Sequence, residues 1–310
     1  MFFRNLTVFR FPTSTKLDDL DTGLGECSLK PVGPMELSSR GFIPPFGRDA
    51  DQMSHRQGDA LWLTVGGEER LLPGSVVNDM LARKLAEFEK KEGRKPGGRT
   101  RKRLKDELIV DLLPRAFIKP TRTDALLDLQ HGLVVVDSSS RKSAENVVSE
   151  IRRALGSFPA LPLNAEVAPR SILTGWLAGE PLPDGLTLGD ECELRDPMEH
   201  GAVVKCQRME LQCDEIHKHL ESGKQVTRLA LNLDDHVSFV LGEDLVIRKF
   251  KLLDGAVASL ENSEDLRAEL DARFALMSAE VKRLFVVLEG ALKLSKVDVY
   301  GCRRRTTPTS

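Results

Sequence analysis

The sequence lacks the features that would indicate a membrane protein or an exported one. No run approaches the roughly eighteen consecutive apolar residues that a membrane-spanning helix needs. The opening MFFRNLTVFRF alternates in character and carries Arg4 and Arg10, which indicates a strand and not a signal peptide. The five cysteines are odd in number and none forms a CxxC pair, a pattern typical of reduced cytosolic thiols. We therefore expect a cytoplasmic protein that has no membrane partner.

Catalytic motifs are also missing. The chain contains no G-x-G-x-x-G, G-x-S-x-G or H-E-x-x-H. Gly223-Lys224 does not belong to a phosphate-binding loop, because Lys218 stands where that loop requires glycine. Asp111 and the Asp234-Asp235 pair could bind a nuclease metal, yet the pair falls in a predicted turn, where Asp is common for local hydrogen-bonding reasons. The sequence therefore favours a protein that is not an enzyme.

A zinc site is the other chemical candidate, and its ligand set is incomplete. Cys213 and His217 are four residues apart on a predicted helix, as two ligands on one helix face would be. No fourth ligand lies nearby in the sequence, and His219 points away from His217 around the helix. We expect exposed helix residues here, and neither a metal nor another cofactor.

Positive charge, in contrast, is concentrated in one short stretch. From Arg94 to Lys105 seven of twelve residues are Lys or Arg and none is acidic, although the formal net charge of the chain is −2. Residues 82–105 carry eleven basic and three acidic side chains, a local excess of +8, so the remainder carries −10. Such segregation predicts a defined anion-binding face on an acidic body. This tip cluster consists of Arg94, Lys95, Arg99, Arg101, Lys102, Arg103 and Lys105.

Two features separate the tip cluster from an ordinary solvated loop. It falls on a predicted helical hairpin, and further cations recur on separate predicted strands. Aromatic residues make up only 5% and are not interleaved with the cations, which favours contact with a duplex backbone over stacking of single-stranded bases. We expect sequence-independent duplex binding that weakens steeply with salt. The candidate DNA-binding residues outside the tip cluster are Arg115, Lys205, Arg208, Arg228, Arg248 and Lys249.

The hydrophobic pattern predicts an α+β fold with mixed or antiparallel sheets. Apolar stripes at about 75–91 and 100–113 predict two helices that fold back at GRKPGG. This helical hairpin, 74–117, is inserted in a discontinuous central α+β domain, 1–73 and 118–160. A C-terminal α+β domain, 161–310, follows, with a disordered tail from about 302.

Local patterns predict several β-hairpins and one long helix. ALWLTVGGEERLLP, residues 60–73, predicts a hairpin that turns at Gly66-Gly67. Residues 124–137 predict a second hairpin, and residues 225–254 predict a meander of three strands. A helix from about 262 to 292 carries an apolar seam that could serve the core or a partner.

Seven segments, in order, resemble the bacterial RdgC family of recombination-associated proteins. The likeness covers nearly the whole chain and weakens after about residue 290. No one segment is diagnostic, but the ordered set is fairly specific. The segments are FFRNLTVFRF, GFIPPFGR, LLPG, DLLPRAF, GLVVVD, ALGSFPALPL and VTRLAL.

The resemblance implies a nucleoid-associated protein that forms a closed, ring-shaped homodimer. Such a ring threads duplex DNA through a positively lined hole without marked sequence preference and restrains the RecA recombinase; single-stranded DNA is a further candidate partner. The family carries no catalytic residues. The Phe of its LPRAF motif contributes to a dimer contact, which assigns that role to Phe117, and the matching basic positions of the second half are Lys205 and Arg208.

Three functions stay open at this point. The first is a non-catalytic ring that binds duplex DNA and limits RecA. The second is a protein-interaction module that grips RecA directly, with DNA binding secondary. The third is a metal nuclease that uses Asp111 or Asp234-Asp235.

Overall fold

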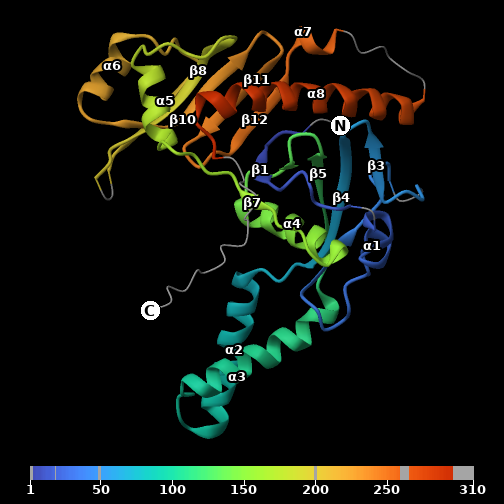
Figure 1. The fold of residues 1–310 in the computed structure, drawn as a ribbon. Coiled ribbons are helices and arrows are strands. Elements are labelled where there is room, and N and C mark those ends of the chain that lie inside the picture. The colour runs from blue at the N-terminus through green and yellow to red at the C-terminus, as the bar shows by residue number, and fades with distance from the viewer. Residues whose placement is uncertain (1–2, 18, 48–49, 199–200, 259–264, 296–310) are drawn as a thin grey trace, which may run out of the picture.

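A computed structural model of the chain describes residues 3–17, 19–47, 50–198, 201–258 and 265–295 (Figure 1). It confirms the α+β class: two antiparallel sheets, helices packed on them and a helical hairpin that projects from the first sheet. Within these ranges, no helix has the length and apolar character needed to cross a bilayer. The predicted tail from about 302 lies outside the described residues.

The first sheet has the order β2-β4-β5-β6-β1-β7, with β3 paired to the other part of β4. The predicted hairpin of residues 124–137 is confirmed, since β5 pairs with β6 across a turn in which Gly132 has φ +64°. The strands are β1 (Thr7–Arg10), β2 (Ser38–Phe42), β3 (Ser54–Gln57), β4 (Ala60–Arg70), β5 (Ile118–Asp128), β6 (Leu133–Val136) and β7 (Leu161–Pro162).

The predicted hairpin at Gly66-Gly67 is wrong, because β4 runs unbroken through both glycines. Gly66 lies opposite Gly41 of β2, and β5 pairs with β4 along its whole length. A Cβ atom at Gly66 would lie 2.8 Å from Cγ2 of Ile43, and one at Gly67 would lie 2.6 Å from Oγ1 of Thr121. These glycines permit close approach of neighbouring chain segments and do not form a turn.

Of these three glycines, Gly41 lies closest to a neighbouring chain segment, so its replacement should destabilise the protein. A Cβ atom there would lie 2.5 Å from the backbone nitrogen of Leu29, which cannot move without shifting the chain. We expect Gly41→Ala to lower the free energy of unfolding by about 2–4 kcal/mol. Urea denaturation measures the change. Gly74→Ala, where a Cβ atom meets nothing within 4 Å, is the control, and equal midpoints for the two variants would contradict the prediction.

The second sheet has the order β12-β11-β10-β8-β9. The predicted meander of residues 225–254 is confirmed as β10, β11 and β12. Asp234 and Asp235 turn the chain between the first two strands with φ of +44° and +53°. The strands are β8 (Leu186–Arg195), β9 (Val203–Gln207), β10 (Gln225–Leu233), β11 (Val237–Gly242) and β12 (Ile247–Leu252).

The start of the chain joins the two sheets. Leu6, directly before β1, exchanges two backbone hydrogen bonds with Ile247 of β12, at 2.8 and 3.0 Å. The backbone nitrogen of Phe250 donates to the carbonyl of Arg4 at 2.8 Å. The N-terminal segment therefore continues the edge of the second sheet before it enters the first.

Each face of the first sheet has its own apolar core. Helices α1 (Leu20–Glu26) and α4 (Arg141–Leu155) cover one face, where Leu63 and Val134 are buried with Ile151. The N-terminus of α4 is capped, since the side chain of Ser140 accepts a hydrogen bond from the backbone nitrogen of Ser143. The opposite face packs toward the second sheet. The remaining short helices are α5 (Pro169–Leu177), α6 (Asp214–Glu221) and α7 (Asp254–Val257).

Helix α8 (Leu266–Ala291) lies along the boundary between the two sheets (Figure 1). The ring of its Phe274 stacks on Trp62 of β4 at 5.5 Å between centroids, and Val281 is buried in the same core as Phe239 of β11. The seam of this helix therefore serves the core, although two of the helix's apolar residues, Leu266 and Val286, are 67% and 61% exposed. The division into domains stays a prediction, because this one core contains side chains from both sheets.

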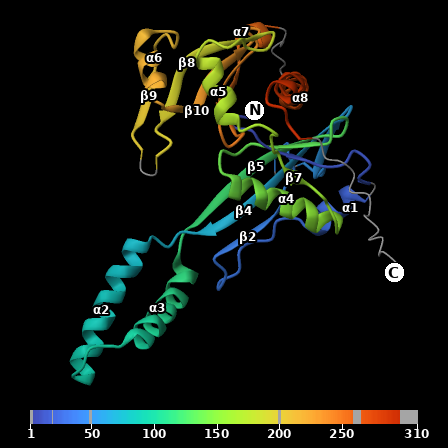
Figure 2. The ribbon, with the colours of Figure 1, turned by 60° about the vertical axis from the view of Figure 1, so that its left-hand side comes forward.

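The predicted helical hairpin is confirmed as α2 (Gly74–Glu92) and α3 (Gly98–Leu112). It stands at the far end of β4 and β5, which extend together with β2 beyond the other strands of the sheet (Figure 2). Val77 and Leu81 of α2 pack on Leu108 of α3 in a small core of their own. Gly93 ends α2 in the left-handed conformation, with φ +66°, which lets the chain turn back toward α3.

Candidate nucleic-acid interface

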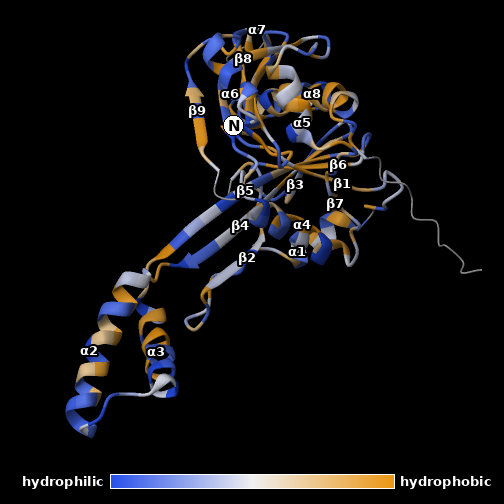
Figure 3. Ribbon diagram, turned by 90° about the vertical axis from the view of Figure 1, so that its left-hand side faces the viewer, coloured by the Kyte–Doolittle hydropathy of each residue, from blue (hydrophilic) through white to orange (hydrophobic). Residues whose placement is uncertain are grey.

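The tip cluster lies where the sequence predicted it, on the loop between α2 and α3 and on the first turns of α3. Every one of its seven side chains is exposed. Figure 3 shows that the far ends of both helices are hydrophilic. Only Arg103 has an ion pair among the described residues, with Glu107 at 3.6 Å, so the other six cations are available to a ligand.

The position of these cations does not stabilise α3. The first turn of α3 has no acidic residue, and its N-cap, Gly97, offers no side-chain hydrogen bond. Arg99, Arg101 and Lys102 stand beside the positive end of the helix dipole, where each cation costs about 0.3–1 kcal/mol at low ionic strength. A bound anion would relieve this repulsion. Lys90 and Lys91 differ, since they lie in the last turn of α2, where cations are favourable.

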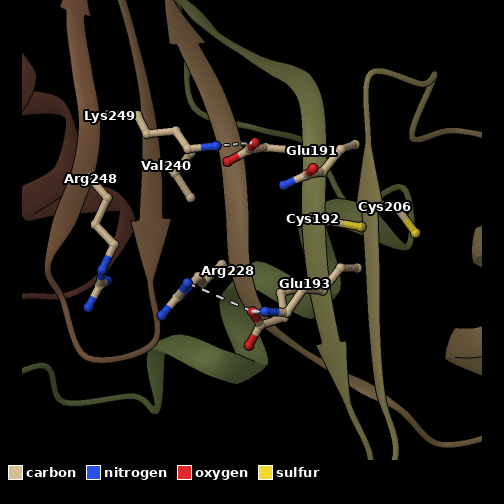
Figure 4. A pocket seen from close by; sticks show the side chains of 10 residues that line it. Glu191, Cys192, Glu193, Cys206, Arg228, Val240, Arg248 and Lys249 are labelled. Atoms are coloured by element: carbon tan, nitrogen blue, oxygen red, sulfur yellow. Dashed lines mark hydrogen bonds and ion pairs between the residues drawn. The ribbon is translucent and has the colours of Figure 1, made fainter.

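A second group of cations lies on the outer face of the second sheet, opposite α5 and α8. We call this group the sheet cluster: Arg195, Lys205, Arg228, Arg248 and Lys249. Except for Arg195, its members line a hollow of about 200 Å³ together with Glu191 and Glu193 (Figure 4). Cross-strand pairing places them, because Glu193 lies opposite Lys205 on β9 and opposite Arg228 on β10.

The cations of the sheet cluster are paired with acids of the same chain. Figure 4 shows Lys249 directed toward Glu191, at 2.5 Å, and Arg228 directed toward Glu193, at 3.8 Å. Glu193 also lies 3.4 Å from Lys205. Arg248 binds Asp244 through both terminal nitrogens, at 2.5 and 2.9 Å. Three carboxylates therefore offset part of the charge of the five cations in the sheet cluster, whereas only one cation of the tip cluster is paired within the described ranges.

Glu193 is the central acid of this surface. Burial pushes the pKa of its carboxyl upward, but the hydrogen bond from Thr227 and the charges of Arg228 and Lys205 outweigh burial, and the pKa lies below its ordinary value. The Asp244 carboxylate likewise raises the pKa of Arg248. The lowered pKa values keep the Glu193 and Asp244 carboxylates ionised at neutral pH, so both attract the neighbouring cations.

The sequence did not reveal these acids as site residues. Glu191 and Glu193 alternate along β8, which indicates a shared face, but only the register with β9 and β10 shows which cations they meet. Arg208 departs from the group, since it lines a separate hollow with Asp190 and Glu210. Arg115 is exposed at the base of the hairpin, in the turn η1 (Leu113–Arg115).

The two groups of cations lie far apart in one chain. Figures 1, 2 and 3 all show the hairpin at one end of the molecule and the second sheet at the other. One copy therefore does not bring the predicted DNA-binding residues to a common surface.

Phe117 stands between the hairpin and β5 with its ring in solvent. The residue is 84% exposed, although its carbonyl accepts a hydrogen bond from the nitrogen of Leu71 at 2.8 Å. Leu71 and Ile118 beside it are 47% and 46% exposed. The backbone at this joint is fixed, and an apolar ring projects from it, as an interface anchor would.

The candidate metal ligands do not converge. Asp111 lies on α3 and pairs with Lys84 at 3.3 Å, while Asp234 lies in the turn between β10 and β11 and pairs with Arg283. Nδ1 of His217 lies 2.9 Å from the carbonyl of Cys213. Across the described part of the chain, no three His, Cys, Asp or Glu side chains are grouped to hold a metal ion.

The cysteines inside the described ranges are free thiols, as the sequence predicts: Cys27, Cys192, Cys206 and Cys213. Cys192 lies opposite Cys206 across β8 and β9. Burial, with the neighbouring Cys206 thiol, raises the pKa of Cys192 to about 12, so this thiol is protonated at neutral pH. Cys302 lies outside the described residues.

Comparison with known proteins identifies the family. A family model described as "Putative exonuclease, RdgC" matches residues 1–295. The "Recombination-associated protein RdgC" of Xanthomonas axonopodis pv. citri (strain 306) is 71% identical over 301 residues, which are 96% of this chain and 100% of that protein. The protein of the same name from Stenotrophomonas maltophilia (strain R551-3) is 64% identical over the same coverage. The resemblance carried by the ordered motifs is confirmed, and the chain belongs to the RdgC family.

Proposed function

We propose that two copies of this chain close into a ring around duplex DNA, bind it through its phosphates without catalysis, and thereby restrain RecA during homologous recombination. The names of the relatives associate them with recombination. The ring, the duplex and RecA are our inference from the likeness to the family and from the charges of this chain.

The tip cluster is the observation that carries the proposal. Six cations that have no ion pair within the described part of the chain lie at the end of a projecting hairpin, beside a helix N-terminus that attracts anions, and form a surface suited to phosphates. The hairpin offers no recognisable set of side chains for reading base edges, so we expect binding that does not depend on sequence.

Two separated cationic groups favour a closed dimer over a single copy. A two-fold axis would duplicate both groups, so that four cationic surfaces could face a common channel. Closure requires contact at two places in each chain. Phe117 supplies one candidate, and the seam of α8 does not supply the other because it is buried.

A salt challenge on DNA of different topology tests the ring. A ring bound to linear duplex can slide off an end, whereas on a covalently closed circle it must open. We therefore expect complexes on circles to survive a rise in salt at least about 10-fold longer than complexes on linear DNA of the same sequence. Blocking both ends of the linear DNA should remove the difference. Equal lifetimes on open linear DNA and on circles would overturn the ring.

The same preparations separate the other two functions. Magnesium-dependent cleavage of either substrate would favour a nuclease, in keeping with the word exonuclease in the description of the family. Inhibition of RecA that persists in variants that no longer bind DNA would favour direct contact with RecA. The proposal expects intact DNA and loss of inhibition together with loss of DNA binding.

A further inference from the structure

The acidic residues that pair with the sheet cluster have no role in the proposed function. Three cations converge on Glu193, namely Arg195 at 3.6 Å, Lys205 at 3.4 Å and Arg228 at 3.8 Å. These distances are longer than those of tight charge-assisted hydrogen bonds, so the cations surround the carboxylate without being locked to it.

Glu193 lies beneath the cations that it neutralises. Its side chain is only 10% exposed, whereas those of Lys205 and Arg228 are 64% and 47% exposed. The hydroxyl of Thr227 donates to its Oε1 at 3.1 Å and fixes the carboxylate. A phosphate that approaches these cations from solvent must therefore also approach a fixed negative charge.

We propose that Glu193 is a built-in competitor for phosphate, which limits how tightly the outer face of the second sheet holds a nucleic-acid backbone. The inference rests on the proposed function, since it concerns the same ligand. The two basic groups then contribute unequally to binding. The tip cluster supplies most of the affinity for the nucleic-acid backbone, and the sheet cluster makes a contact that the Glu193 carboxylate keeps weak.

Glu193→Gln removes the charge and keeps the shape and the acceptor for Thr227. Loss of one negative charge a few ångströms from the bound phosphates should tighten binding to a mixed-sequence duplex by about 3- to 10-fold at low salt. Fluorescence anisotropy of a labelled duplex measures the affinity. Glu145→Gln on α4 is the matched control, because Glu145 is exposed, pairs with Arg141 at 3.7 Å and changes the net charge equally.

The gain must also depend on the cations that are released. Adding Lys205→Gln and Arg228→Gln to Glu193→Gln should abolish it. Equal affinity of Glu193→Gln and Glu145→Gln, or a gain that survives loss of both cations, would overturn the inference. Should the Glu193 variant fail to fold, Glu191→Gln, which releases Lys249, must give a smaller gain of the same sign, and no gain there would overturn it equally.

The inference can fail while the proposed function stands. Loss of binding on removal of the tip cluster, with no gain in Glu193→Gln, would refute the competitor and leave duplex binding in place. Unaltered binding in both variants would refute the proposed function itself.

Discussion

Replacing Arg101, Lys102 and Arg103 together by glutamine is expected to weaken duplex binding by about 100- to 1,000-fold at 0.1 M salt. Each lost phosphate contact lowers the slope of log affinity against log salt concentration by about 0.9, so three contacts lower it by about 2.7 for each hairpin that meets the duplex. Glutamine keeps the helix propensity of α3 and removes only charge. Binding to several unrelated duplexes over a range of salt concentrations measures both quantities.

The control for this variant removes three cations elsewhere. Arg141, Lys142 and Arg153 are exposed on α4, on the first sheet, and their triple replacement by glutamine changes the net charge equally. That variant should bind nearly as the natural chain does. If both triple variants weaken binding to the same extent, the effect comes from net charge and not from the tip. A loss confined to one sequence would contradict backbone recognition.

Phe117→Ala is expected to raise the dissociation constant of the proposed dimer by about 30- to 1,000-fold, because exposed aromatic anchors of interfaces are worth about 2–4 kcal/mol when truncated. The ring is 84% exposed in one chain, so its removal should leave the stability of the protomer within about 0.5 kcal/mol. Sedimentation equilibrium over a range of protein concentrations measures the change in assembly.

A second exposed apolar side chain gives the matched control. Leu266 on the first turn of α8 is 67% exposed and lies far along the chain from the hairpin. Leu266→Ala should not change the mass in solution. Dissociation in both variants, or in neither, would remove Phe117 from the interface. Loss of the circle-over-linear preference together with dissociation would tie ring closure to DNA retention.

The helical hairpin could be predicted from the sequence because each of its determinants is local. Apolar spacing identifies α2 and α3, and the glycines and the proline of GRKPGG break the helix between them. The tip cluster lies within that same segment, so its exposure followed from the same pattern. The meander of the second sheet was likewise signalled by its turns.

Features that depend on pairing between distant segments could not be predicted. Gly66-Gly67 has the composition of a turn, and only the approach of Ile43 and Thr121 explains why glycine is needed inside a strand. Glu193 meets its cations through the register of three strands, which periodicity does not give. The apolar seam of α8 is compatible with either a core or an interface. Only the stacking of Phe274 on Trp62 shows that it belongs to the core.

The hydrogen bonds between Leu6 and Ile247 bear on how the chain is made. During synthesis the first strand emerges early, but its partner in the second sheet leaves the ribosome only when most of the polypeptide has been translated. The first sheet can therefore form before the hydrogen bonds between Leu6 and Ile247 do. The joining of the two sheets is a late, long-range and slow step of folding. A nascent chain truncated before β12 should therefore remain sensitive to proteases at its N-terminal segment, although that segment is synthesised first.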